Sequence, residues 1–148
     1  MRKRTQAREC ALQILYQYEM NSQDVNGLIK EFWIENQGMD SDVRVYTERL
    51  VLGTLERLKE IDEVITRYAE NWHLARMAVI DRNILRFAAY ELLYLTDEIP
   101  PKVCINEAVN IAKKYSQEEA GKFVNGILDK INHTERAQKA GPNAAGER

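Results

Sequence analysis

Apolar residues recur every three or four positions along most of the chain, and this spacing constrains the fold more than any other feature. A period of that length places the apolar side chains on one face of an α-helix. In the first segment the apolar face consists of Ala7, Cys10, Ala11, Ile14, Leu15 and Tyr18. No segment shows a strand-like alternation of convincing length, so the sequence predicts an all-α protein of six or seven helices, packed as one bundle or two.

The segment from Met77 to Leu95 differs from the others because it is apolar on most of its sides. A helix that is apolar all round is typically surrounded by other helices. We therefore expect this segment to form the central helix of the protein. Pro100 and Pro101 follow it and end the helical pattern, because proline lacks the backbone N–H that a helix interior requires.

Two short polar motifs predict where helices begin. After Gly38, either Asp40 or Ser41 can accept a hydrogen bond from the free N–H groups at the start of the next helix. Ser116 and Glu119 have the spacing of a capping box, in which each side chain bonds the backbone N–H of the other. The sequence thus predicts a side-chain cap at the start of both helices.

The ionisable residues are unevenly distributed. The 21 lysines and arginines and the 23 acidic residues give a formal net charge of −2. Residues 1–8 nevertheless contain no acid and carry the cations Arg2, Lys3, Arg4 and Arg8. A basic end on a mildly acidic body indicates a local anionic partner rather than general coating of nucleic acid.

Two further features bear on the cellular compartment. No run approaches the about 18 apolar residues that a membrane-spanning helix needs, so no membrane partner is expected. Cys10 and Cys104 lie on apolar helix faces and lack the C-x-x-C spacing of a redox pair. Such thiols are typical of core residues in a reducing compartment, which predicts a cytoplasmic protein; a disulfide between them is the less favoured alternative.

The sequence carries no pattern of catalytic or metal-binding residues. His73 and His133 have no cysteine or second histidine at metal-ligand spacing. A glycine-rich phosphate loop and a nucleophile elbow are also absent from the sequence. We therefore expect no enzymatic activity, no cofactor and no metal.

The strongest candidate for a binding surface is the basic first helix. Arg4 and Arg8 lie one turn apart, and Tyr16 is two turns beyond Arg8 and rotated by about 80°. Arginines attract phosphates, and an aromatic ring offers a surface on which an unpaired base stacks. The alternative is that the basic residues form a solvated chain end and that Tyr16 lies at the edge of the core. Phe123, at the margin of the last apolar face, has the same two interpretations.

Four segments, in this order along the chain, resemble one known family. They are Arg8–Tyr16 (RECALQILY), Ile80–Leu92 (IDRNILRFAAYEL), Val103–Val109 (VCINEAV) and Lys122–Asp129 (KFVNGILD). In these segments the sequence is similar to the NusB family of transcription antitermination factors, and the similarity spans residues 3 to about 132.

This resemblance implies an all-α fold of two packed three-helix bundles with an extra helix. On that basis residues 1–132 form one NusB-like helical domain, with an N-terminal bundle at about 3–72 and a C-terminal bundle at about 76–132. Residues 133–148 lose the apolar periodicity and are expected to be a disordered tail. The resemblance also implies binding to single-stranded boxA-like leader RNA together with the ribosomal protein NusE, within an antitermination complex on RNA polymerase.

The resemblance further implies roles for individual residues. Family positions that contact RNA are matched here by Arg8, Tyr16, Tyr68, Glu119 and Phe123. The predicted RNA surface also includes Arg2, Lys3, Arg4 and Lys122. Positions that face or lie near NusE are matched by Asp81, Arg82 and Arg86. Because an acid repels phosphate, Glu119 would accept from a base amino group, and this role competes with its role as a helix cap.

Two other functions remain open from the sequence. A helical adaptor that binds only proteins would have the same fold, and it would bind NusE without RNA. Some RNA methyltransferases carry a NusB-like N-terminal domain, but a chain of 148 residues has no room for a nucleotide-binding sheet as well. A homodimer is also open, and it could bury the first-helix surface that RNA would use.

Overall fold

The computed structural model describes residues 2–21, 23–70 and 73–136. These residues form seven α-helices and no β-strand, which confirms the all-α prediction. The α-helices are α1 (Lys3–Asn21), α2 (Val25–Glu35), α3 (Ser41–Glu56), α4 (Leu58–Tyr68), α5 (Val79–Tyr94), α6 (Pro101–Tyr115) and α7 (Glu118–Ile131). A short 3-10 helix, η1 (Leu74–Arg76), precedes α5, and a π-helical turn, η2 (Asn132–Arg136), follows α7.

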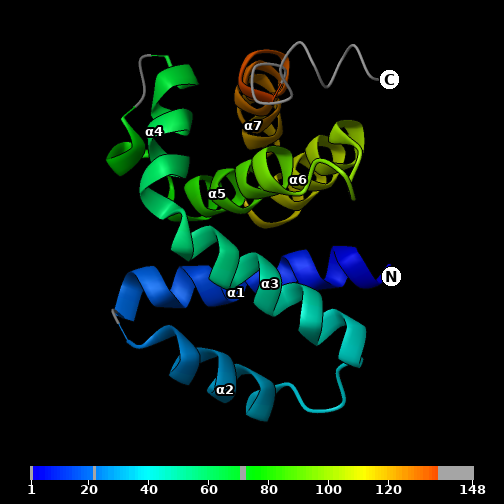
Figure 1. Ribbon diagram of the computed structural model, residues 1–148. Coiled ribbons are helices and arrows are strands. Elements are labelled where there is room, and N and C mark those ends of the chain that lie inside the picture. Colours follow the sequence, from blue (N-terminus) through cyan, green and yellow to red (C-terminus); the bar gives the residue numbers. More distant parts are fainter. Residues whose placement is uncertain (1, 22, 71–72, 137–148) are drawn as a thin grey trace.

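The helices form two groups that meet where α1 and α3 pack on α5 (Figure 1). One group contains α1, α2 and α3, and the other contains α4, α5, α6 and α7. From the sequence we expected the residues of α4 in the N-terminal bundle. Its apolar face instead packs against α5 and α7, so the boundary between the groups falls at Arg57, where α3 ends and α4 begins.

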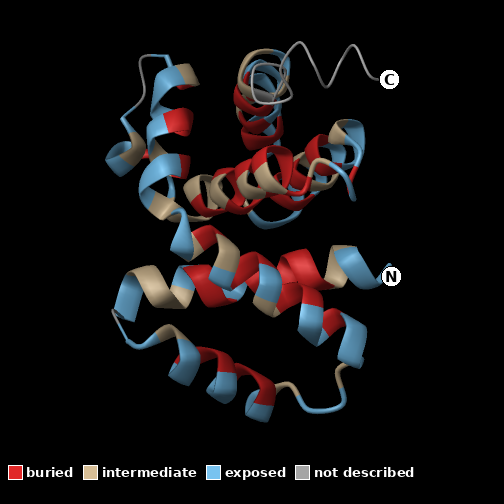
Figure 2. Ribbon diagram, viewed as in Figure 1, coloured by how far each residue is buried: buried red, intermediate tan, exposed pale blue. Residues whose placement is uncertain are grey.

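Helix α5 is the centre of the molecule, as the sequence predicted. It packs against α1, α3, α4, α6 and α7. Buried positions recur along it from Asn83 to Leu93 (Figure 2), and its largest buried side chain, Phe87, is fully enclosed. Burying an apolar side chain of this kind stabilises the fold by roughly 1.5–3 kcal/mol relative to exposing it. The apolar surface of α5 on most sides therefore explains why the other helices surround it.

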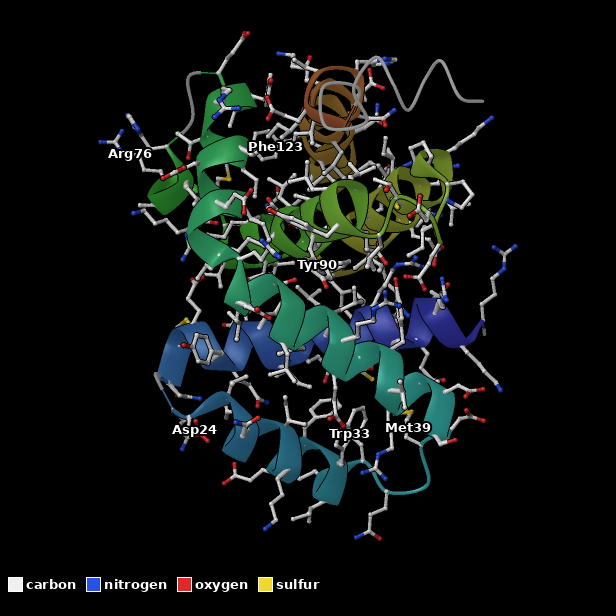
Figure 3. All side chains as sticks on the ribbon, viewed as in Figure 1. Asp24, Trp33, Met39, Arg76, Tyr90 and Phe123 are labelled. Atoms are coloured by element: carbon white, nitrogen blue, oxygen red, sulfur yellow. The ribbon has the colours of Figure 1, made fainter. Side chains whose placement is uncertain are left out.

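Helix α3 crosses α5 closely at Gly53, next to the ring of Tyr90 (Figure 3). A Cβ atom added to Gly53 would lie 2.2 Å from Cζ of Tyr90. The tyrosine ring therefore occupies the space that any larger residue at position 53 would need. A glycine inside a helix costs about 1 kcal/mol relative to alanine, and here the close helix approach offsets that cost.

The predicted cap of α3 is confirmed, whereas the predicted capping box of α7 is wrong. Asp40 precedes α3, and its Oδ1 accepts from the N–H of Asp42 at 2.8 Å. Before α7 the N-cap residue is Gln117, whose side chain makes no capping bond. Ser116 instead ends α6, where its N–H donates to the carbonyl of Ala112 at 2.8 Å. Because the link between the two helices is so short, Ser116 belongs to the end of α6 and lies one residue too early to cap α7.

The two cysteines and the chain end also bear on the predictions. Cys10 and Cys104 are buried and form no disulfide. Burial raises the pKa of the Cys10 thiol to about 11, as expected of a core residue. The predicted disordered tail begins too early, because residues 133–136 belong to η2 and Glu135 contacts α4. Residues 137–148 lie outside the described part of the chain.

Candidate nucleic-acid interface

The start of α1 presents three exposed cations, here called the N-terminal basic patch: Arg2, Lys3 and Arg4. Lys3 donates from Nζ to Asp42 Oδ2 at 3.0 Å, which raises the pKa of Lys3 and partly neutralises its charge. Arg4 places its guanidinium 4.6 Å from the centre of the Tyr46 ring, in a cation–π contact that holds it against α3. The patch is therefore positively charged, and most of the charge that is not paired with an acid comes from Arg2 and Arg4.

Arg8 lies inside the molecule, although the sequence predicted it to contact RNA. Only 2% of its side chain is exposed. Its Nε donates to both carboxylate oxygens of Glu91 at 3.1 and 2.9 Å, and its Nη1 donates to Glu107 at 2.9 Å. Burial disfavours the guanidinium charge, but the carboxylates of Glu91 and Glu107 raise the pKa of Arg8 on balance. This burial argues against the predicted RNA contact, and it gives Arg8 the role of joining α1 to α5 and α6.

Tyr16 is 40% exposed. It follows Glu9 by two turns, so both side chains lie on one face of α1. Glu9 accepts from Lys114 Nζ at 2.9 Å, and the same Nζ lies 5.1 Å from the centre of the Tyr115 ring. The last turn of α6 therefore borders the face that carries Tyr16. Lys114 and Tyr115 were missed from the sequence, although a basic residue next to an aromatic residue at a helix end was a usable signal.

A cleft of about 330 Å³, here called the α7 cleft, lies where the start of α7 meets the start of α5. Its lining residues include Ala78, Asp81, Ser116, Gln117, Glu119 and Phe123. Phe123 is half-buried on α7 (Figure 3) and packs against the core, whereas Glu119 is exposed, as is Lys122 beside it on the same helix. The cleft thus brings two predicted RNA residues together with Asp81, which the resemblance placed at the protein partner.

Tyr68 lies away from the α7 cleft, near the opposite end of α7. It is half-buried, and its hydroxyl donates to Glu135 in η2. Arg67 Nη1 also donates to Glu135, at 2.8 Å. The hydrogen bond to this carboxylate raises the pKa of Tyr68, because the protonated phenol is the form that donates the bond. The structure therefore gives Tyr68 a contact between α4 and η2, and its contact with RNA remains a prediction.

Arg82 and Arg86 belong to an ion-pair network between α1, α4 and α5. Both pair with Glu19, Arg86 through Nη1 at 2.7 Å, and Arg86 also donates from Nε to Asp62 at 2.9 Å. Arg82 Nη1 donates to the carbonyl of Met77 at 2.9 Å, which ties the segment before α5 to that helix. Although burial raises the pKa of Glu19, the two arginines lower it on balance. Both arginines are half-buried, and their contact with a protein partner remains a prediction.

Two further observations concern the described residues as a set. None of their helices is both long and apolar enough to cross a membrane. In the same ranges no three histidine, cysteine or acidic side chains are grouped so as to hold a metal ion. His73 and His133 are exposed.

Comparison with known proteins identifies the family. The NusB family model matches residues 5–133. The chain belongs to the NusB family. The resemblance inferred from the four sequence motifs is thereby confirmed, and the match covers α2 to α7 completely and all but the first two residues of α1.

Two NusB-family transcription antitermination proteins illustrate the similarity. The protein from Thermodesulfovibrio yellowstonii is 48% identical over 138 residues, which cover 87% of this chain and 91% of that protein. The protein from Desulfitobacterium hafniense is 49% identical over 127 residues, which cover 84% of each chain.

Solved NusB structures share the fold. T. maritima NusB has a TM-score of 0.82 and 39% identity, covering 92% of this chain and 94% of that chain. A crystal structure of the antitermination factors NusB and NusE in complex with double-stranded RNA contains a chain with a TM-score of 0.81 and 32% identity. That match covers 90% of this chain and 98% of the other. The helical fold of this NusB-family chain is therefore the NusB fold.

In this NusB-family chain the predicted RNA residues other than Arg8 and Tyr68 fall in three places. The N-terminal basic patch lies at one end of α1. Tyr16 lies twelve residues beyond Arg4, about 18 Å along the helix axis, on the face of α1 that also carries Glu9, the partner of Lys114 in α6. The α7 cleft holds Glu119 and Phe123. A single strand that touched all three places would therefore follow α1 and then cross to α7.

Proposed function

We propose that this NusB-family protein is a transcription antitermination factor without catalytic activity, acting in the cytoplasm. It binds boxA-like single-stranded leader RNA together with NusE and joins the antitermination complex on RNA polymerase. The observation that carries this proposal is the similarity to the NusB chain of the complex with NusE and double-stranded RNA, over 98% of that chain.

The exposed side chains support RNA as a ligand. The arginines of the N-terminal basic patch attract phosphates, and each neutralised phosphate releases counterions. Tyr16 and Tyr115, 40% and 38% exposed, offer rings on which unpaired bases can stack. The solved relative holds double-stranded RNA. A preference for a single strand is our inference, because only unpaired bases can stack on these rings.

The proposal assigns the surfaces as follows. The N-terminal basic patch, Tyr16, Lys122 and the α7 cleft bind RNA. Arg82 and Arg86, which Glu19 pairs with, and Asp81 at the border of the α7 cleft mark the surface that we assign to NusE. Arg8 is buried and supports the fold rather than contacting RNA, whereas the half-buried Tyr68 stays a candidate RNA contact.

Fluorescence anisotropy tests the proposal with a labelled boxA-type strand, a duplex of that sequence and a scrambled strand of the same composition. Each RNA is measured with and without NusE. We expect the boxA strand to bind most tightly, and NusE to increase its affinity by about tenfold or more. RNA recovered after incubation should be chemically unchanged.

Two results would contradict the proposal. Equal affinity for the boxA strand and the scrambled strand, with NusE present, would show that the protein does not recognise the boxA sequence. Binding to NusE without detectable RNA binding would identify a protein-only adaptor.

A further inference from the structure

Arg4 of the N-terminal basic patch rests on an aromatic ring of α3. Its guanidinium carbon lies 4.6 Å from the centre of the Tyr46 ring, and Arg4 is nevertheless an exposed residue. A planar guanidinium that lies over an aromatic face keeps its N–H groups available for an anion. The contact therefore orients Arg4 without using up its hydrogen-bond donors.

The Tyr46 ring is itself held in place by buried partners. Tyr46 is 6% exposed, and its hydroxyl donates to the carboxylate of Glu91, which is fully buried on α5. Glu91 also accepts from Nε of Arg8 at 2.9 Å. Burial raises the pKa of Tyr46, so the phenol keeps the proton that it donates to Glu91. Because its hydroxyl is hydrogen-bonded in the core, the ring offers Arg4 a fixed support.

A cleft between α1 and α3 lies beside this pair. It has a volume of about 390 Å³ and is lined by Lys3, Arg4, Asp42, Val45, Tyr46 and Arg49. Two of its three cations have acidic partners: Lys3 donates to Asp42 at 3.0 Å, and Arg49 donates from Nη1 to Glu98 at 2.9 Å. Arg4 forms no ion pair with any residue that the structure describes. Among the cations of this cleft, Arg4 therefore has the charge that a phosphate can use.

We propose that Tyr46 is a positioning residue, which holds Arg4 for contact with a phosphate of the RNA. This inference rests on the proposed function and adds a residue of α3 that acts through Arg4. An arginine that is already held in one orientation loses less rotamer freedom when RNA binds, so the affinity rises without a new contact. Arg2 makes no cation–π contact with a described aromatic residue, so the same substitutions at Arg2 provide a comparison.

The test measures the affinity of the full chain for a boxA-type strand over a range of salt concentrations. Tyr46→Leu removes the ring and keeps an apolar side chain. We expect it to weaken binding at low salt by about 3- to 10-fold. The slope of log K against log salt should become shallower by about 0.7, the share of one phosphate contact. In an Arg4→Gln background, Tyr46→Leu should change the affinity by less than about twofold, because the side chain that it positions is gone.

Conservative variants separate the ring from the rest of Tyr46. Tyr46→Phe keeps the ring and loses the hydroxyl, so it should keep the wild-type slope even where it lowers stability. Arg4→Lys keeps the charge and loses the planar guanidinium, so it should weaken binding more than Arg2→Lys does. This lysine pair leaves the core unchanged and carries the test if Tyr46→Leu fails to fold.

Trp33 on α2 provides a matched control. It is 6% exposed, and the guanidinium carbon of Arg44 lies 5.2 Å from the centre of its ring. Trp33→Leu therefore removes a buried ring from beneath an arginine outside the N-terminal basic patch. We expect it to lower stability and to leave the RNA affinity and the salt slope of the folded protein unchanged.

Three outcomes would overturn the inference. If Tyr46→Leu weakens binding equally with and without Arg4, or if Arg4→Lys and Arg2→Lys have equal effects, the ring does not act through Arg4, although RNA binding stands. If Tyr46→Leu tightens binding, the ring holds Arg4 away from the phosphates. If the wild-type protein binds no RNA, the proposed function fails and the positioning role fails with it.

Discussion

At the scale of single residues, Arg8 carries a charge into the core. Glu91, which is fully buried, accepts from Arg8 and from the hydroxyl of Tyr46. Burial raises the pKa of Glu91, and the guanidinium of Arg8 acts against that rise. The fold tolerates these two buried ionisable side chains because they carry opposite charges and form an ion pair. Removing either one leaves the other buried and uncompensated.

Replacement of Arg8 tests this structural role. Arg8→Met keeps a long apolar stem but leaves Glu91 without its cation, and we expect a loss of about 3–5 kcal/mol in the free energy of unfolding. Urea unfolding followed by circular dichroism measures the loss. Adding Glu91→Gln should recover part of it, and the exposed control Arg2→Met should change stability by less than about 0.5 kcal/mol. Unchanged stability combined with lost RNA binding would instead restore Arg8 as an RNA contact.

At the scale of helices, packing between helices decided two features differently from what we expected, one taken from local sequence and one from the family resemblance. Ser116 and Glu119 have the spacing of a capping box, but Ser116 ends α6 and Gln117 is the N-cap of α7. The residues of α4 follow α3 closely in sequence, but their apolar face packs against α5 and α7. In both cases a neighbouring helix determines the contact that is made, so the contact cannot be predicted from the local sequence pattern.

The crossing of α3 and α5 gives a prediction at this scale. Gly53→Ala gains about 1 kcal/mol of helix propensity but forces the Tyr90 ring to move, which costs about 1–3 kcal/mol. We expect a net loss of up to about 2 kcal/mol in urea unfolding. In a Tyr90→Ala background the obstacle is gone, so the same glycine replacement should stabilise the protein. Stabilisation by Gly53→Ala in both backgrounds would show that the ring moves without cost.

At the scale of the whole molecule, the N-terminal basic patch and the α7 cleft lie on different parts of the fold. The N-terminal basic patch lies at the free end of α1, and the α7 cleft lies where α5 and α7 begin. The net charge of −2 limits attraction to nucleic acid in general. RNA binding should therefore depend on a few phosphate contacts and on local contacts with bases.

Salt dependence measures the number of phosphate contacts. We expect a slope of about −2 to −4 for log K against log salt, because a single strand contributes roughly −0.7 for each phosphate contact. Combining Arg2→Gln with Arg4→Gln should make the slope shallower by about 1.4. Lys59→Gln, an exposed neutral replacement on α4, serves as the matched control. An unchanged slope in the double variant would show that the N-terminal basic patch makes no phosphate contacts.

The helices were predictable because they depend on short-range information. The apolar period predicted α5 as the central helix, and Asp40 predicted the start of α3. Four motifs were enough to indicate the NusB family, which the family match confirms. Of the candidate RNA residues, Glu119 and Phe123 were predictable as neighbours because they lie one turn apart on α7.

The contacts between helices were not predictable from these patterns. From the sequence alone, Arg8 on the first helix is expected to be a surface charge. Its partner Glu91 lies on α5, 83 residues further along the chain, so only the packed structure shows the pair. Oδ1 of Asp81 is likewise buried beside the α7 cleft, which forms only where α7 packs beside the start of α5. Helical periodicity follows from neighbours three and four residues apart, so the chain alone specifies it. Burial, ion pairing and the shape of a cleft depend on which helices meet, so they are set by the packed molecule.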